Sequence, residues 1–136
     1  MSTRNILIVD DQPTNVRLLE CTLRRGGFDS ITTTTDPCAV AAMQREHHYD
    51  LILLDVVMPG MNGFQVMEAL GRDAPVLIMT ADPRQRVRAM AAGARDFISK
   101  PFVLADVVTR VSNLLEFENK AAIVATVLRK AALVAH

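Results

Sequence analysis

Short aliphatic runs alternate with longer amphipathic stretches along this chain. Such runs, bounded by turn residues, are typical of strands that lie buried in a parallel sheet with helices on both faces. We predict strands at 6–9, 28–34, 51–55, 76–80 and 96–99. The intervening stretches predict helices at 13–25, 36–47, 63–70, 82–93 and from 103 onward. This regular alternation predicts an α/β fold built from βα units with right-handed crossovers.

Turn residues support most of these boundaries. Pro13 stands at the start of the first helix, where a missing N–H costs nothing, and Gly26-Gly27 follows its end. Asp36-Pro37 and Asp82-Pro83 each combine a helix-capping side chain with a proline at the first helical position. We therefore expect the second helix to begin at Asp36 and the fourth at Asp82.

Composition and charge exclude several classes of protein. The 136 residues suit one domain, and half of them are hydrophobic, enough for a sizeable core. Fifteen basic and fifteen acidic residues give no net charge, so nothing indicates binding to nucleic acid or to an anionic membrane. No apolar run approaches the roughly 18 residues of a membrane span, and the first residues lack a signal-peptide pattern. We expect a cytoplasmic protein.

Five polar residues stand at, or just beyond, the carboxyl ends of predicted strands. They are Asp10, Asp11, Asp55, Thr80 and Lys100. In an open parallel sheet these ends meet at one edge, which is where ligands bind. Asp55 is the most telling of them, because it closes the central aliphatic run Leu51-Ile52-Leu53-Leu54. A carboxylate in that position points to chemistry rather than to packing.

The residue types at this edge favour phosphoryl transfer assisted by a metal ion. Three converging carboxylates repel one another, and a hard dication relieves that repulsion. Mg²⁺ is the expected ion, since it binds a few carboxylates and completes its shell with water and phosphate oxygens. Asp55 can attack phosphorus to form an aspartyl phosphate, while Thr80 and Lys100 supply a hydroxyl and a positive charge for the phosphoryl oxygens.

The chain resembles the receiver domain of bacterial response regulators, the CheY-like superfamily of two-component signal transduction. The resemblance covers residues 5–117. It rests on five pieces in the right order and spacing, each weak alone. They are Val9-Asp10-Asp11, Leu54-Asp55 with Met58-Pro59-Gly60-Met61-Asn62-Gly63, Met79-Thr80-Ala81, Gly93-Ala94 and Lys100-Pro101-Phe102. The resemblance implies a flavodoxin-like (βα)5 sandwich whose five-stranded parallel sheet has the order 2-1-3-4-5.

The resemblance also implies a role for each matching residue. Asp55 would be the phosphoacceptor, and Asp10, Asp11, Asp55 and the backbone carbonyl of Val57 would hold Mg²⁺. Lys100 would bridge the acidic site and the phosphoryl group, with a cis peptide bond before Pro101. Thr80 would be the switch hydroxyl and Phe97 the switch aromatic, although Phe97 lacks the hydroxyl of the tyrosine often found there.

Two further positions are implied to tune the lifetime of the phosphoryl group. They are Val57 and Asp82, each two residues after a site residue. An acid at Asp82 can orient water or repel a donor, and the sequence leaves both readings open. The arginines Arg84, Arg86 and Arg88 that follow are expected to form a solvated helix face. The resemblance implies an alternative, because the fourth helix, fifth strand and last helix form the usual signalling face of the family.

The implied function is a phosphorylation-dependent switch rather than an enzyme. A histidine kinase or a histidine phosphotransfer protein would supply the phosphoryl group, and the output domain or effector stays unknown. One alternative is an aspartyl-phosphate hydrolase, but such enzymes typically carry a second aspartate where Val57 stands. The other is a receiver-like module that never takes phosphate, which would have no need of the full set of site residues. A metal or phosphotransfer role for His47 and His48 is disfavoured, because no second ligand cluster accompanies them.

The tail departs most from a minimal receiver domain. We assign residues 1–118 to the receiver domain and 119–136 to a helical extension, because the segment after residue 116 has no Gly or Pro. Apolar residues recur at spacings of three and four, typical of a coiled-coil seam. The seam comprises Leu114, Phe117, Ala121, Val124, Leu128, Ala131 and Ala135. We expect a homodimer through this helix. A fold-back onto the domain and a linker to an output domain are the alternatives.

Overall fold

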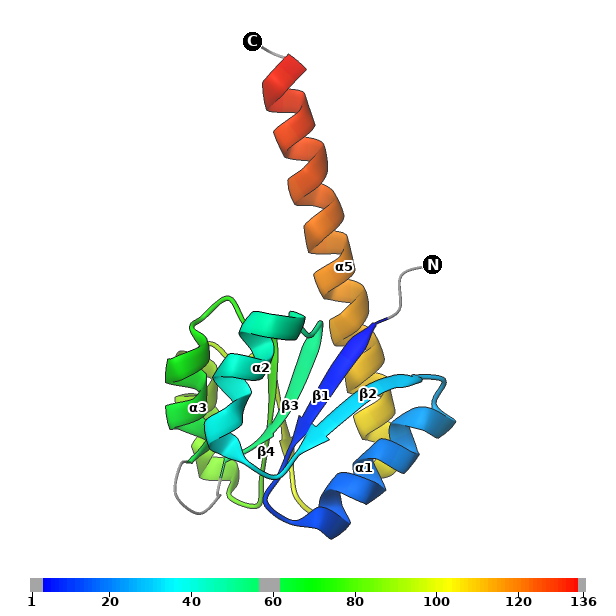
Figure 1. Ribbon diagram of the computed structural model, residues 1–136, viewed down its shortest axis with the longest axis vertical. Helices are drawn as coiled ribbons and strands as arrows, with labels where there is room; N and C mark the ends of the chain where they lie inside the picture. Colours follow the sequence, from blue (N-terminus) through cyan, green and yellow to red (C-terminus); the bar gives the residue numbers. More distant parts are fainter. Residues whose placement is uncertain (1–3, 57–61, 135–136) are drawn as a thin grey trace.

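A computed structural model describes residues 4–56 and 62–134 as a three-layer α/β sandwich with one long protruding helix (Figure 1). Five parallel strands form one sheet in the order β2-β1-β3-β4-β5, which confirms the implied topology. The strands are β1 (Asn5–Val9), β2 (Ser30–Thr34), β3 (Leu51–Asp55), β4 (Val76–Thr80) and β5 (Asp96–Ser99). The helices are α1 (Pro13–Arg25), α2 (Val40–His47), α3 (Gly63–Leu70), α4 (Arg86–Ala91) and α5 (Leu104–Val134), with short 3-10 helices η1 (Pro37–Ala39) and η2 (Pro83–Gln85).

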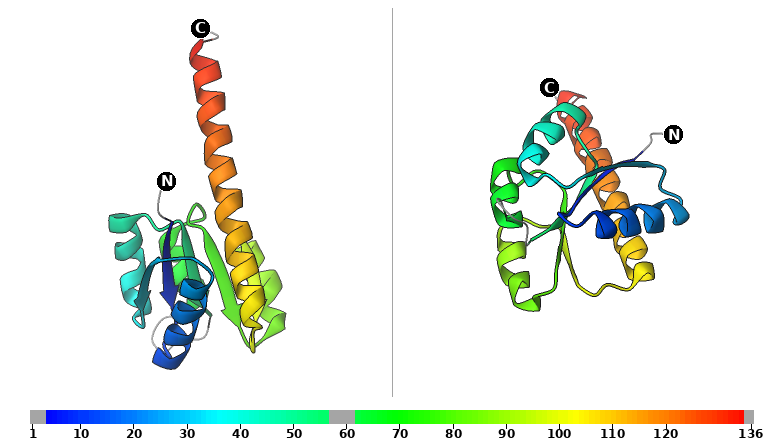
Figure 2. Two further views of the ribbon diagram at one scale, coloured as in Figure 1. Left: turned by 90° about the vertical axis from the view of Figure 1, so that its right-hand side faces the viewer. Right: turned by 60° about the horizontal axis from the view of Figure 1, so that its bottom comes forward.

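Side chains that alternate along the central strands fill two separate cores. In β3, Ile52 and Leu54 pack toward α2, α3 and α4, whereas Leu51 and Leu53 pack toward α1 and α5. All five residues of β3 are buried, and so are all five of β4. Figure 2 shows helices on both sides of the sheet. Burial on both faces explains why these strands are continuous aliphatic runs rather than alternating ones.

Two helices begin differently from the sequence prediction. Asp36 and Asp82 do cap, but each accepts a hydrogen bond from the backbone N–H two residues on, at Cys38 and Arg84. The backbone carbonyl of each Asp then closes a three-residue turn, and the result is the 3-10 helices η1 and η2. The α-helices α2 and α4 therefore start only at Val40 and Arg86. The predicted strand at 28–34 is also shorter, since β2 begins at Ser30.

The long helix α5 has a buried and an exposed part. Val107, Val111 and Leu115 are buried against the sheet and α1. Beyond them the helix runs on in one continuous piece, away from the domain (Figures 1 and 2). Phe117, at 60 %, and Leu128, at 64 %, are exposed in this part. In the described ranges, no helix has the length and hydropathy to cross a membrane.

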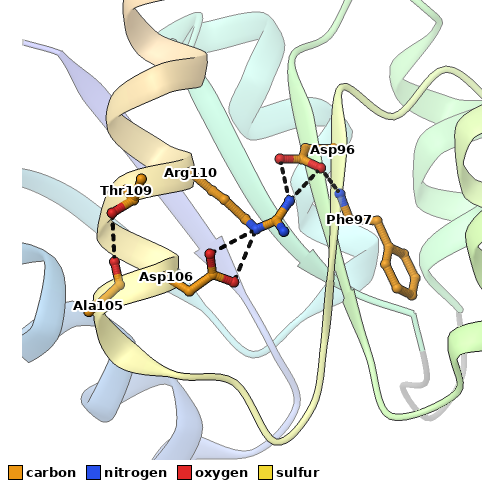
Figure 3. A network of polar contacts seen from close by, with 6 residues as sticks. All are labelled: Asp96, Phe97, Ala105, Asp106, Thr109 and Arg110. Carbon is orange, nitrogen blue, oxygen red and sulfur yellow. Dashed lines mark hydrogen bonds and ion pairs between the residues drawn. The ribbon is translucent and has the colours of Figure 1, made fainter.

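Arg110 fastens α5 to the edge strand β5. Its guanidinium donates to both carboxylate oxygens of Asp96 at 2.9 Å and to those of Asp106 at 3.1 and 3.2 Å (Figure 3). The hydrogen bonds to Asp96 and then to Asp106 raise the pKa of Arg110 above its ordinary value. Asp96 also accepts from the backbone N–H of Phe97 at 2.8 Å. The base of the long helix is thereby tied to the strand that carries Phe97.

Candidate functional site

The parallel register brings the predicted site residues to one edge of the sheet. Asp55 pairs with Met79 and Thr80 pairs with Ser99, so the ends of β3, β4 and β5 lie level. Asp10 follows the last residue of β1, next to the end of β3. Lys100 follows β5, and its backbone N–H donates to the carbonyl of Thr80 at 2.7 Å. The sequence prediction that these residues share one edge is confirmed.

Three carboxylates form a compact acidic cluster at this edge. Asp10, Asp11 and Asp55 each place an oxygen so that the three atoms lie within 4.8 Å of one another. Asp10 is fully buried and Asp55 nearly so, while Asp11 is partly exposed. Such crowded negative charges repel strongly, because burial removes the water that would screen them. The cluster therefore needs cations.

Hydrogen bonds hold the buried carboxylate of Asp10 in a fixed orientation. Its Oδ1 accepts from the backbone N–H of Gln12 at 3.0 Å. Its Oδ2 accepts from the side-chain amide of Asn15 at 3.4 Å and from the ammonium of Lys100 at 3.1 Å. A buried ionised group needs partners of this kind. The start of α1 thus supports the site as well as covering it.

Lys100 supplies one positive charge to the cluster. Its Nζ lies 3.1 Å from Asp10 Oδ2 and 3.4 Å from Asp55 Oδ2. The peptide bond between Lys100 and Pro101 is cis, as the resemblance implied. One ammonium leaves the cluster of Asp10, Asp11 and Asp55 with a net negative charge. The oxygens of these carboxylates are hard ligands, so the donor set fits Mg²⁺.

A pocket of about 500 Å³ opens beside the phosphoacceptor candidate. Thr80 lies at its wall, and its hydroxyl accepts from the backbone N–H of Asp82 at 3.2 Å. The volume suffices for a phosphoryl group and a small leaving group. The lining residues are Asp55, Thr80, Ala81, Asp82, Arg84 and Lys100.

Gly63 packs closely against the backbone of Asp55. A Cβ at this position would lie 2.7 Å from the carbonyl oxygen of Asp55 and 2.8 Å from the Cα of Val56. The backbone N–H of Gly63 donates to the carbonyl of Val56 at 2.7 Å. Only glycine allows this approach, which packs the first turn of α3 against the end of β3. The sequence prediction placed Gly63 at the helix start but gave no sign of this contact.

The remaining candidates are placed as follows. Phe97 is buried in the core on the α4 side of the sheet. Val57 lies outside the described residues, so its predicted carbonyl ligand stays a prediction. His47 ends α2 and His48 follows it in a left-handed conformation. Both precede β3 in the chain and so lie near the end of that strand opposite to Asp55.

Two arginines acquire partners that sequence patterns did not predict. Arg84, expected on a solvated face, pairs with Asp82 at the pocket, with Nε 3.0 Å from Oδ1. Arg110, which lies in α5 before the apolar seam begins, bridges β5 and α5. Its spacing of four from Asp106 on a predicted helix was an available signal. The contact with Asp96 had none, since it depends on how α5 packs.

A family model for the response regulator receiver domain matches residues 6–112. Among curated relatives, the response regulator PleD of Caulobacter vibrioides is 42 % identical over 125 residues, covering 87 % of this chain and 27 % of its own length. The DNA-binding response regulator MtrA of Mycolicibacterium smegmatis is 38 % identical, covering 79 % of this chain and 49 % of its own length. The chain thus spans about a quarter to a half of the curated relatives it matches.

Solved structures give the same match. A putative response regulator from Chloroflexus aurantiacus superposes with a TM-score of 0.77 at 28 % identity, covering 85 % of this chain and 99 % of the other. A chemotaxis response regulator of Vibrio cholerae superposes with a TM-score of 0.74 at 25 % identity, covering 83 % of this chain and 99 % of the other. Both chains have nearly their whole length in common with this sandwich.

Proposed function

The chain belongs to the response regulator receiver domain family, and from that premise we propose that Asp55 accepts a phosphoryl group and thereby switches the conformation of the domain. One observation carries the assignment. The carboxylates of Asp10, Asp11 and Asp55 gather within 4.8 Å, and Lys100 joins the two buried ones. A purely structural role would not gather three carboxylates, two of them beside one ammonium, next to an open pocket.

Asp10, Asp11 and Asp55 are proposed to hold Mg²⁺, with the backbone carbonyl of Val57 as a further ligand. When bound, the ion supplies positive charge to the carboxylates and to the oxygens of the transferred group. Asp10 is held in a fixed orientation for this role, because Gln12 and Asn15 each donate to one of its two oxygens.

The transfer itself needs little beyond positioning. A carboxylate oxygen of Asp55 attacks phosphorus, a new O–P bond forms, and the bond from phosphorus to the donor breaks with its electron pair leaving on the donor. Lys100 reaches Asp55 already and would keep its positive charge beside the transferred group. Thr80 offers its hydroxyl from the pocket wall as a hydrogen-bond donor to a phosphoryl oxygen.

A histidine kinase or a histidine phosphotransfer protein is the proposed donor, because two-component receivers take their phosphoryl group from phosphohistidine. The domain is regulatory in this proposal and acts as an enzyme only on itself. The alternative of an aspartyl-phosphate hydrolase gains no support from the site. A phospho-independent module would not require Lys100 between two buried aspartates.

Labelling with a small-molecule phosphodonor tests the proposed function. In the presence of Mg²⁺ the chain should gain one phosphoryl group that is stable in acid and lost in base, as an acyl phosphate is. Chelation of the metal with EDTA should abolish the gain. A label that survives base, or one that forms equally with EDTA, would contradict the assignment.

Thr80→Ala should take phosphate yet lose most of the conformational response. The hydroxyl is the group that can follow a phosphoryl oxygen, and in this structure it is engaged with the backbone N–H of Asp82. Hydrogen–deuterium exchange over η2, α4 and β5, with and without the phosphodonor, measures the response. Thr109→Ala is the matched control, since that hydroxyl donates only to a carbonyl one turn earlier within α5. An unchanged conformational response in Thr80→Ala would contradict the switch role proposed for Thr80.

The exposed part of α5 is proposed as the contact between two copies of the chain. Phe117, Val124 and Leu128 are each more than half exposed, although together they follow a coiled-coil spacing. The helix continues past the domain in one piece and does not fold back onto its own sheet (Figure 2). An apolar stripe of this size usually marks an interface. Ala at other seam positions limits the buried area, so the pairing should be modest in strength.

A chain ending at residue 118 should sediment as a monomer, whereas the full chain should sediment as a dimer at tens of micromolar. Val124→Glu combined with Leu128→Glu provides a full-length variant with the same expected result. Arg129→Glu, a change on the same exposed helix off the stripe, should stay dimeric. A monomeric full chain would favour a downstream partner for the helix instead.

A further inference from the structure

An ion pair forms part of the wall of the pocket beside Asp55. Asp82 and Arg84 both line the pocket that also contains Asp55, Thr80 and Lys100. Arg84 Nε donates to Asp82 Oδ1 at 3.0 Å, and Nη2 donates to Oδ2 at 3.2 Å. Both carboxylate oxygens therefore face the guanidinium in the two-pronged geometry that arginine favours. The Arg84 side chain as a whole is 90 % exposed to solvent.

Arg84 favours the charged form of Asp82 and neutralises that charge. The side-chain hydrogen bond from Arg84 is the main reason why the pKa of Asp82 lies below its ordinary value. The same bond to Asp82 raises the pKa of Arg84. Both groups are thus ionised near neutral pH, and to an approaching anion they present a neutral pair rather than a bare carboxylate.

Among the described residues that line the pocket, the one other cation, Lys100, is not available to replace Arg84. Lys100 lines the same pocket, but its ammonium is already engaged by Asp10 and Asp55. Arg86 lies two residues after Arg84 in the sequence, but it lines a different pocket, between η2, β5 and α5. Without Arg84, Asp82 would add a bare negative charge to a pocket that already contains Asp55.

We propose that Arg84 is a positioning residue for phosphoryl transfer, which masks Asp82 and so admits dianionic acyl phosphates to Asp55. The proposal rests on the proposed function, because it requires Asp55 to be the acceptor. With acetyl phosphate, the bond between phosphorus and the acetyl oxygen breaks as the bond to Asp55 forms. Acetate leaves with the electron pair, and no proton is transferred.

The test compares initial phosphorylation rates with acetyl phosphate and Mg²⁺ in the full chain. Arg84→Ala should slow the reaction about two- to fivefold at low salt, the range that an exposed charge pair supports. The deficit should shrink at molar salt, where charges are screened within about 3 Å. Arg84→Lys retains the positive charge and should restore most of the rate. Arg86→Ala is the matched control and should react as wild type does.

The double variant separates masking from direct contact with the donor. Asp82→Asn keeps an oxygen that can accept the backbone N–H of Arg84, so the cap of η2 is preserved. In that background Arg84→Ala should have no effect, because no charge is left to mask. The deficit should also be smaller with phosphoramidate, which near neutral pH carries one negative charge fewer than acetyl phosphate.

Three results would overturn the masking role. They are a normal rate in Arg84→Ala, a deficit that persists unchanged in the Asp82→Asn background, and an Arg84→Lys rate as low as that of Arg84→Ala. Failure of the proposed function looks different, because wild type itself would then take no phosphoryl group. The wild-type rate therefore serves as the reference that separates the two.

Discussion

Asp55→Asn should take up no phosphoryl group under conditions in which wild type is fully labelled. The amide has the shape of the carboxylate but lacks the nucleophilic oxygen, so the expected effect is complete loss rather than a slower rate. Asp55 ends the buried strand β3 and lines the pocket of about 500 Å³, where a donor would enter. Intact mass after incubation with acetyl phosphate and Mg²⁺ measures the uptake.

Asp73→Asn is the matched control for this experiment. Asp73 is an exposed carboxylate in the turn before β4, outside the acidic cluster, and its loss should leave labelling unchanged. Circular dichroism and a denaturant melt establish that both variants are folded. Equal labelling of Asp55→Asn and wild type would move the acceptor to another residue.

Lys100→Ala should destabilise the metal-free protein by about 3 kcal/mol, the low end of what removing one partner of a buried ion pair costs. The low end applies because the Lys100 side chain is 20 % exposed. Removing the ammonium leaves Asp10, which is fully buried, without the cation 3.1 Å away. Urea melts in EDTA measure the change, and Lys130→Ala on the exposed part of α5 is the matched control.

The change in the free energy of unfolding should have the opposite sign when a carboxylate is neutralised instead. Asp11→Asn or Asp55→Asn removes one of three repelling charges, so the free energy of unfolding in EDTA should rise by about 1 kcal/mol. Added Mg²⁺ should then stabilise wild type more than these variants, by mass action on the folded state. A Lys100→Ala protein as stable as wild type, or clearly destabilised Asp variants, would contradict the crowded-charge account.

The strand ends were predictable from the sequence because burial on both faces leaves a plain signal. Leu51 to Leu54 are four aliphatic residues in a row, and Asp55 interrupts that pattern at the point where the strand stops. Parallel strands then bring Asp10, Thr80 and Lys100 to the same edge by topology alone. Local pattern and sheet geometry were sufficient for this part of the site.

Contacts between elements left no comparable signal. Gly63 is needed because the first turn of α3 approaches the carbonyl of Asp55, and that distance depends on how α3 packs. Arg110 donates to Asp96, a residue 14 positions earlier in the sequence, across the contact between α5 and β5 (Figure 3). The 3-10 starts of α2 and α4 arise from turns that the capping Asp residues close, where the sequence pattern predicted regular helix.

The most direct test of the account is to identify the phosphorylated residue in wild type, without any substitution. Borohydride reduces an aspartyl phosphate to homoserine, which fragment mass spectrometry locates within a peptide. After treatment with acetyl phosphate and Mg²⁺, homoserine is predicted at position 55 and at neither 10 nor 11. Homoserine at Asp10 or Asp11, or a phosphoryl group on His47 or His48 instead, would contradict the account.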